Sequence, residues 1–272
     1  MRIKVQHRTT YLYDAPPSSI VQILRLTPRN YEGLQVRSWR IFLDHDANLV
    51  PGEDAFGNII HTLSLNRALD DLTIGVEGEV ETTDTGGVVK GAVERFPPGL
   101  YLRDTPLTHA DDAIKAMAHD VIGAKEGLDG LHALLSTLHE TLTFDGTRTD
   151  VKATAAEAWA AKGGVCQDYA HIFIAAARSM GIPARYVGGY MLRTDMQQQN
   201  AGHAWTEAYV PSLGWVGFDP ANCISPTEAH IRVAMGLDYL GAAPVRGSQS
   251  GGAAEQLQVS VTVGQSRRQQ QN

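Results

Sequence analysis

The spacing of apolar residues changes once along this chain, and that change limits its possible folds more than any other feature. From Arg2 to about Val80 apolar and polar residues alternate, as in half-buried strands; examples are IKVQHRTTYLY, NIIHTLSLN and LTIGVEGEVET. After residue 108 apolar residues recur at spacings of three and four, as in DGLHALLSTLHETLTFD, which predicts helices. The pattern predicts an α+β protein in which an N-terminal β-rich unit precedes a unit of helices and strands.

The boundaries of these units follow from composition. Residues 85–108 are rich in glycine and proline, which is typical of a connection between units. The final residues are polar and without periodicity, and only LQVSVTV before them has strand character. We therefore expect the following parts: a β-rich N-terminal domain over 1–90, a linker over 91–108, a core of helices and strands over 109–240, a loop and returning strand over 241–264, and a disordered tail over 265–272.

Charge and cysteine content exclude several classes of protein. The formal net charge is −7, from 23 basic and 30 acidic residues, which disfavours a nucleic-acid or anionic-membrane partner. The first residues lack the apolar stretch of a signal peptide, and no run of 18 apolar residues occurs. Two cysteines in 272 residues indicate free thiols in a reducing compartment. We therefore expect a cytoplasmic protein.

One of the two thiols stands at a predicted helix start. Thr154, with Glu157 three residues later, forms a capping box that begins a helix over TAAEAWAAKGG. The glycine pair 163–164 is expected to end it. The apolar stripe of the next helix extends back to Cys166, and Gly181 ends that helix.

This position favours nucleophilic chemistry. Unpaired backbone N–H groups and the positive end of the helix dipole both favour the thiolate of Cys166. The same N–H groups can bind the oxyanion of an acyl transfer, and Gln167 could donate to it as well. Gly164 would let a substrate backbone approach closely. Judged on position alone, a small buried cysteine that merely begins a helix is the alternative.

A cysteine nucleophile needs a base, and the base needs an orienting partner. His203 opens the predicted strand HAWTEAYV, and Asp219 closes GWVGFD, with a turn between them. If five residues form the loop, Tyr209 pairs with Trp215 and Asp219 falls opposite Trp205. Asp219 and His203 are then diagonal neighbours on one face of the hairpin. A four-residue loop would place the acid on the other face unless a bulge intervenes.

These segments together resemble a known family. The stretches GGVCQDYAHIFIAAARSMGIPARYVGGY and HAWTEAYVPSLGWVGFDPAN are similar to the core of transglutaminase-like proteins. Residues 1 to about 80 resemble the β-rich region that bacterial members carry before that core. The resemblance implies a papain-like core of helices packed on an antiparallel sheet. It also implies Cys166 as nucleophile, His203 as base and acid, and Asp219 as the residue that holds the imidazole.

Other residues near these positions have competing explanations. Trp205 could cover the imidazole or form a wall of the acyl site, but core packing explains it equally well. Glu207 shares a strand face with His203 and is a rival orienting acid. Asp168 is explained by the helix dipole alone.

No metal or other cofactor is expected. Cys166 and His171 lie on different faces of one helix, and no metal-ligand motif joins them to His203 or Cys223.

The sequence thus predicts an enzyme that forms a thioester acyl-enzyme from an amide in a peptide or protein. Hydrolysis by a protease, amidase or deamidase is favoured, because it needs no second binding site. A true transglutaminase with an amine acceptor is the alternative within the class. A peptide-binding module with an inert thiol is the alternative outside it. No nucleic acid or membrane partner is expected, and the oligomeric state is not predicted.

Overall fold

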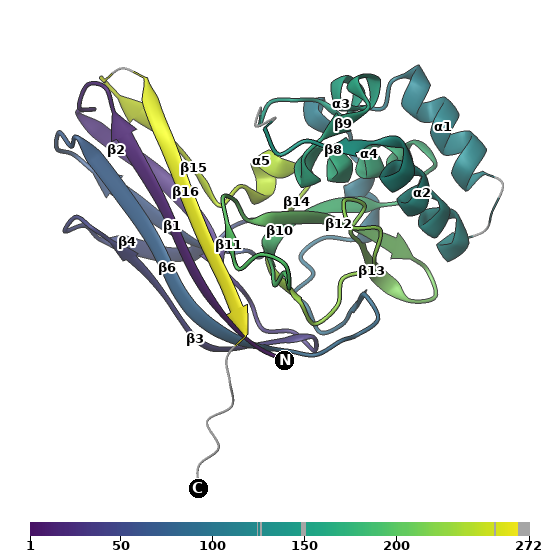
Figure 1. Cartoon of the computed structure of the whole chain (residues 1–272), viewed down its shortest axis with the longest axis horizontal. Helices are drawn as coiled ribbons and strands as arrows, with labels where there is room; N and C mark the ends of the chain where they lie inside the picture. Colours follow the sequence, from purple (N-terminus) through teal and green to yellow (C-terminus); the bar gives the residue numbers. More distant parts are fainter. Residues whose placement is uncertain (124, 126, 148–150, 253, 266–272) are drawn as a thin grey trace, which may run out of the picture.

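The computed structural model describes residues 1–123, 125, 127–147, 151–252 and 254–265. Except for Gln265, the tail expected to be disordered lies outside these residues. The fold is α+β, as the sequence predicts: an antiparallel β-sandwich stands beside a mixed unit of helices on an antiparallel sheet (Figure 1). Within the described ranges no helix is long and apolar enough to cross a membrane.

Two sheets form the sandwich. One has the strand order β11-β16-β1-β6-β3 and the other the order β15-β2-β5-β4. Alternate residues of β1 are buried, which is the consequence of its period-two sequence. The strands from the first part of the chain are β1 (Arg2–Tyr13), β2 (Ser19–Thr27), β3 (Leu34–Leu43), β4 (Leu49–Glu53), β5 (Ile59–Leu65) and β6 (Asp71–Thr82).

The end of the chain returns to complete this sandwich. Strand β16 (Glu255–Gln265) pairs with β1 along its whole length, and β15 (Val245–Ser250) pairs with β2. Figure 1 shows both yellow strands beside the purple N-terminal ones. The stretch APVRGSQSGGAAEQ, expected to be a loop, therefore contains a strand. Strand β15 is a sheet edge and its residues are at least partly exposed, so its sequence is polar and lacks the alternation that indicates a strand.

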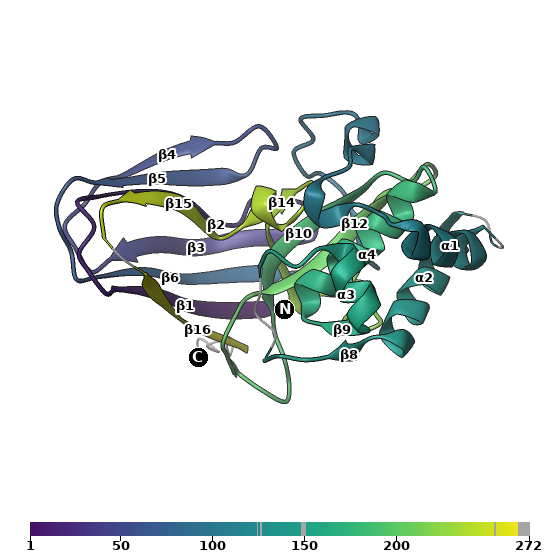
Figure 2. The same ribbon diagram turned by 90° about the horizontal axis from the view of Figure 1, so that it is seen from above.

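The second unit is built on a sheet of order β14-β10-β12-β13-β7. Helices lie on one face of this sheet (Figure 2). Its strands are β7 (Val88–Val89), β10 (Ala184–Met191), β12 (His203–Val210), β13 (Gly214–Phe218) and β14 (His230–Gly236). The helices are α1 (Asp112–Ile122), α2 (Gly127–Thr141), α3 (Ala155–Ala161), α4 (Cys166–Ser179) and α5 (Tyr239–Ala242).

The central helix α4 is buried along nearly its whole length. It packs against α1, α2 and α3 on one side and against β10 and β12 on the other. A short parallel pair, β8 (Thr143–Phe144) with β9 (Gly163–Gly164), lies just before its first residue. The helix start is therefore held by both the helical layer and the sheet.

The segment expected as a linker is packed against the core. It contains two 3-10 helices, η1 (Pro98–Leu102) and η2 (Pro106–Thr108), and Tyr101 within it is fully buried. The guanidinium of Arg178 on α4 donates to the carbonyl oxygens of Tyr101 and Ala184 and to the hydroxyl of Thr108. This buried cation fastens the segment to the helix and to the sheet.

Buried polar contacts join the sandwich to the core. The side-chain amide of Asn58 donates to the backbone carbonyl of Met235 on β14 and accepts the backbone N–H of the same residue. It thus pairs with β14 as the backbone of a neighbouring strand would. His7 on β1 bonds the hydroxyl of Tyr190 at 2.8 Å. A further strand, β11 (Gln198–Gln199), comes from the loop before His203 and pairs with β16.

Candidate active site

The helix that carries the thiol begins as the sequence predicts. Cys166 is the first residue of α4, and its side chain is half-buried. The carboxylate of Asp168 turns back and accepts the N–H of Val165 at 2.8 Å. A Cβ on Gly164 would lie 2.3 Å from that carboxylate, so this glycine is required for packing at the helix start. The acid predicted only as a dipole partner thus caps the helix directly.

The preceding helix confirms the predicted capping box and changes its predicted end. The hydroxyl of Thr154 accepts the N–H of Glu157, whose carboxylate accepts the N–H of Thr154. The left-handed residue that ends α3 is Lys162, at φ 51°, and the glycine pair was the expected stop. Those glycines instead form β9, because their backbone pairs with β8. The ammonium of Lys162 lies 3.2 Å from the centre of the Trp159 ring.

The hairpin has the register that a Cys-His-Asp arrangement requires. Tyr209 pairs with Trp215, the register expected for the five-residue loop, but Val210 also pairs with Gly214, so the turn itself has only residues 211–213. Asp219 directly follows β13 and is fully buried. His203 is the first residue of β12, so the two side chains meet at the same end of the sheet.

His203 Nε2 lies 2.6 Å from Asp219 Oδ2. Burial by itself lowers the pKa of His203, but the charge and hydrogen bond of Asp219 outweigh it. The neighbouring side chain of Cys166 adds to the effect, and the pKa of His203 rises to about 10. The imidazole is therefore placed between the thiol and the carboxylate, and its charged form is favoured.

The carboxylate of Asp219 has several donors. Oδ2 accepts from the imidazole of His203, from the Asn222 amide at 2.8 Å, and from Nε2 of His230 at 3.2 Å. Burial alone would raise the pKa of Asp219. The charge and hydrogen bond of His203, together with the hydrogen bond of His230, hold the pKa of Asp219 well below its ordinary value. The carboxylate is therefore ionised across the ordinary pH range.

Two of the predicted substrate-binding residues have other contacts. Trp205 is only 2% exposed and stacks on His203, with ring centres 6.0 Å apart, so it packs against the imidazole. The side-chain amide of Gln167 donates to the carbonyl of Val151 at 3.3 Å and is buried. It holds the loop before α3 against the helix start.

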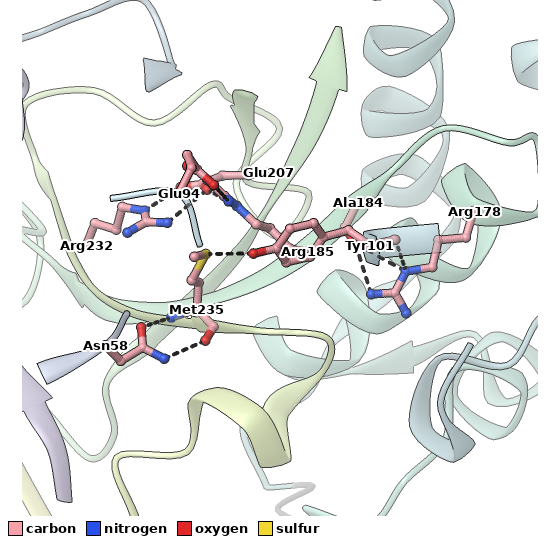
Figure 3. A network of polar contacts seen from close by, with 9 residues as sticks. All are labelled: Asn58, Glu94, Tyr101, Arg178, Ala184, Arg185, Glu207, Arg232 and Met235. Atoms are coloured by element: carbon pink, nitrogen blue, oxygen red, sulfur yellow. Dashed lines mark hydrogen bonds and ion pairs between the residues drawn. The ribbon is translucent and has the colours of Figure 1, made fainter. Parts of the chain in front are cut away.

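Glu207, the rival orienting acid, is committed elsewhere. It lies in a buried ionic network in which its carboxylate binds Arg185 at 2.6 Å and Arg232 at 2.7 Å (Figure 3). Glu94, from the segment before η1, binds the other side of the Arg185 guanidinium. Burial alone would raise the pKa of Glu207, but the two guanidinium groups outweigh it and lower the pKa to about 2.

One group of histidine and acidic side chains in the described part of the chain is compact enough to suggest a metal ion: His203, Asp219 and His230. The backbone N–H of Thr227 donates to Nδ1 of His230, so the proton of this ring is on Nε2. A protonated nitrogen has no lone pair for a metal. The arrangement therefore fits hydrogen bonding to Asp219 better than metal ligation. His171 accepts the N–H of Tyr239 and is fully buried.

His230 and Asn222 are site residues that the sequence analysis missed. Asn222 is placed by the turn after Asp219, in which its N–H donates to the carbonyl of Asp219. His230 opens β14, a strand that the analysis did not predict. The alternation in HIRVAM would have indicated the strand, but no local signal indicates that its first side chain reaches Asp219.

The fold and this site define a papain-like α+β protein with a cysteine, a histidine and an acid in that chain order. Comparison with protein-family models leads to the same class of protein. Residues 115–220 match the transglutaminase-like superfamily, and residues 3–81 match the bacterial transglutaminase-like N-terminal region. Together the matches cover more than half of the chain. The chain belongs to the transglutaminase-like superfamily, with the N-terminal region of its bacterial members.

Individual relatives extend this result. An uncharacterized protein of Mycobacterium leprae is 28% identical over 96% of this chain and 98% of its own length. The crystal structure of a proposed cysteine protease from Cytophaga hutchinsonii superposes with a TM-score of 0.75, covering 95% of this chain and 90% of that one at 19% identity. A protein-glutamine gamma-glutamyltransferase of Pseudomonas aeruginosa is 32% identical over 95 residues, 31% of this chain and 14% of that protein. These comparisons support a cysteine-dependent hydrolase or transferase in general terms.

Proposed function

We propose that this protein is a cysteine-dependent amide hydrolase that uses Cys166, His203 and Asp219 as a catalytic triad. The observation that carries the proposal is the position of the His203 imidazole, which bonds Asp219 at 2.6 Å through Nε2 and also interacts with the side chain of Cys166. A nucleophile, a base and an orienting acid are thus connected in series, which is the arrangement that acyl transfer requires.

The proposed reaction has two halves. The thiolate of Cys166 attacks the carbonyl carbon of an amide, and backbone N–H groups at the start of α4 stabilise the resulting oxyanion. The C–N bond then breaks, and the His203 imidazolium gives its proton to the leaving amine. In the second half His203 takes a proton from water, which attacks the thioester. The products are a carboxylic acid and the regenerated thiol–imidazole pair.

The acyl acceptor distinguishes a hydrolase from a transglutaminase. We favour water, because hydrolysis requires no second binding site. The name of the Pseudomonas aeruginosa relative points to an amine acceptor, so a protein cross-link is the alternative outcome. A peptide or protein amide is the proposed substrate in both cases.

The test is the rate at which iodoacetamide alkylates Cys166 as a function of pH, read by peptide mass spectrometry. Cys223 is the internal control, because its side chain is also half-buried and it is the other free thiol. An ordinary thiol has a pKa of about 8.5 and is roughly 0.3% ionised at pH 6. We expect Cys166 to react up to about 100-fold faster than Cys223 at pH 6, and His203→Ala to remove most of this advantage.

The contrary result is equally clear. Alkylation of Cys166 that rises only near pH 8.5 and is the same in His203→Ala would overturn the proposed triad. It would instead favour a peptide-binding module with an inert thiol.

A further inference from the structure

His230 is a buried histidine that the proposed reaction does not use directly. It opens β14, only 4% of its surface is exposed, and its Nε2 atom lies 3.2 Å from Asp219 Oδ2. The same oxygen atom binds His203 at 2.6 Å. Two imidazoles from different strands therefore converge on one carboxylate oxygen.

The turn before β14 fixes the state of this ring. The backbone N–H of Thr227 donates to Nδ1 of His230 at 3.1 Å, and the backbone N–H of His230 donates to the carbonyl of Thr227 at 3.0 Å. Since Nδ1 accepts a hydrogen bond, it carries no proton, and the proton of the neutral ring is on Nε2. The ring is thus a neutral donor aimed at Asp219.

Packing restricts the ring further. The Trp205 indole and the His230 ring form a T-shaped pair, with a ring-centre distance of 5.3 Å and an interplanar angle of 80°. The same indole supports His203. The other side-chain donor to Asp219 besides the two histidines, Asn222, is exposed. Its bond competes with water, so His230 is the buried anchor of the carboxylate.

We propose that His230 is a positioning residue for the catalytic carboxylate: its Nε2–H holds Asp219 Oδ2 toward His203, while Thr227 fixes the donor tautomer. The inference rests on the proposed function, because it assigns a role within the same triad. Without this donor, the carboxylate can rotate away from the imidazole. His203 then loses the orientation in which it bonds both the acid and the thiol.

Two substitutions separate this role from a merely structural one. In His230→Gln the terminal amide lies near the position of Nε2, so it keeps a donor to Asp219. In His230→Asn the side-chain oxygen lies near the position of Nδ1, so it keeps the acceptor for Thr227 and loses the donor. The readouts are the rate of Cys166 alkylation at pH 6 and the melting temperature of each variant.

We expect His230→Asn to slow alkylation about tenfold or more, since a hydrogen bond to a charged group is worth roughly one to two powers of ten in an equilibrium. His230→Gln should retain most of the wild-type rate. A structural role alone would lower the melting temperatures and leave the rates of the folded proteins equal. Alkylation of His230→Asn at the wild-type rate, with the His203→Ala effect present, would overturn this inference and leave the triad intact.

A second measurement uses the wild-type protein and so does not require that a variant fold. Nitrogen-15 NMR of the histidine rings in the wild-type protein should show His230 as the neutral tautomer protonated at Nε2. A neutral ring with its proton on Nδ1 and none on Nε2 would overturn the role, because that ring could not donate to Asp219. If the wild-type thiol itself shows no His203-dependent reactivity, the triad and this role fail together.

Discussion

The charge on Asp219 explains why the candidate site has the residues it has. A buried carboxylate is tolerated only when hydrogen bonds and charges replace its hydration. Here the fully buried Asp219 accepts from two imidazoles and one amide. One of these donors, His203, also interacts with the side chain of Cys166, which helps to raise the pKa of the imidazole. The requirement to satisfy the carboxylate therefore also orients the proposed base.

This coupling predicts how stability depends on pH. The folded-state pKa of His203 is raised from 6.5 to about 10, so its contribution is fully present below pH 6.5 and is lost as the pH rises toward 10. Asp219, whose pKa is lowered, stays ionised throughout this range. We expect the unfolding free energy of the wild type, minus that of His203→Gln, to fall steadily between pH 6.5 and 10.

Urea denaturation at several pH values measures this difference. His139→Gln is the matched control, because His139 lies on the exposed side of α2, and it should leave the pH dependence unchanged. A difference between wild type and His203→Gln that does not vary with pH would show that the imidazole is not held in its charged form.

For single residues, the sequence predicts those whose positions depend on local structure. Cys166 follows from a helix start. The pairing of His203 with Asp219 follows from one of two hairpin registers, between which the sequence alone does not choose. His230 could not be predicted in this way. Its contact with Asp219 depends on how the turn at Thr227 brings a separate strand beside the hairpin.

Among the elements, the strands that carry the site are tied together by charge on the sheet face that bears Trp205. Arg185 on β10, Glu207 on β12 and Arg232 on β14 form a continuous chain of ion pairs, which Glu94 extends. Arg185 also lies 3.8 Å from the centre of the Trp215 ring on β13. The network therefore fixes the relative positions of β12 and β14, the two strands that begin with His203 and His230.

Removal of one member of this network should be costly. Glu207→Gln leaves the buried guanidinium of Arg185 and the partly buried one of Arg232 without their shared carboxylate. Loss of one partner from a buried ion pair typically costs about 3 kcal/mol or more. Glu207 has a lowered pKa, so its contribution is present above about pH 4.5 and complete at pH 7. Denaturation at pH 7 should show this loss of stability.

The matched control is Glu77→Gln. Glu77 also pairs with an arginine, at 2.8 Å, but its side chain is 41% exposed and that of Arg40 is 69% exposed. An exposed pair of this kind contributes less than about 1 kcal/mol. Equal effects of the two substitutions would mean that burial does not strengthen the role of the network.

Elements were predicted well where burial follows a simple period, and poorly where it does not. Strand β1 buries alternate residues and α2 buries a leucine stripe, so both are visible in the sequence. Strand β15 is polar because it is an edge, and α3 ends at Lys162 because the next two glycines are needed in β9. In both cases pairing with a distant segment overrides the local pattern.

On the scale of the whole molecule, the sandwich is not formed by one continuous stretch of the chain. The chain begins in the sandwich, forms the core, and then returns to the sandwich through β15 and β16. Local composition cannot reveal such a closure, because the paired residues lie more than 200 positions apart in the sequence. The loop before His203 takes part as well, since β11 joins the edge of β16 and Gln197 accepts the N–H of Val263.

The pairing of β11 with β16 predicts that a truncation at the C-terminus affects the distant site around His203. Removal of residues 255–272 deletes β16, exposes the edge of β1, and releases the loop that leads into His203. Among the described residues of the deleted segment, Val261 and Val263 belong to the buried core. We expect a lower melting temperature and slower Cys166 alkylation at pH 6. Removal of residues 266–272 alone spares β16 and should change neither quantity. If the longer truncation melted and reacted like the full chain, the returning strand would have no part in holding the site, and the core would have to position His203 unaided.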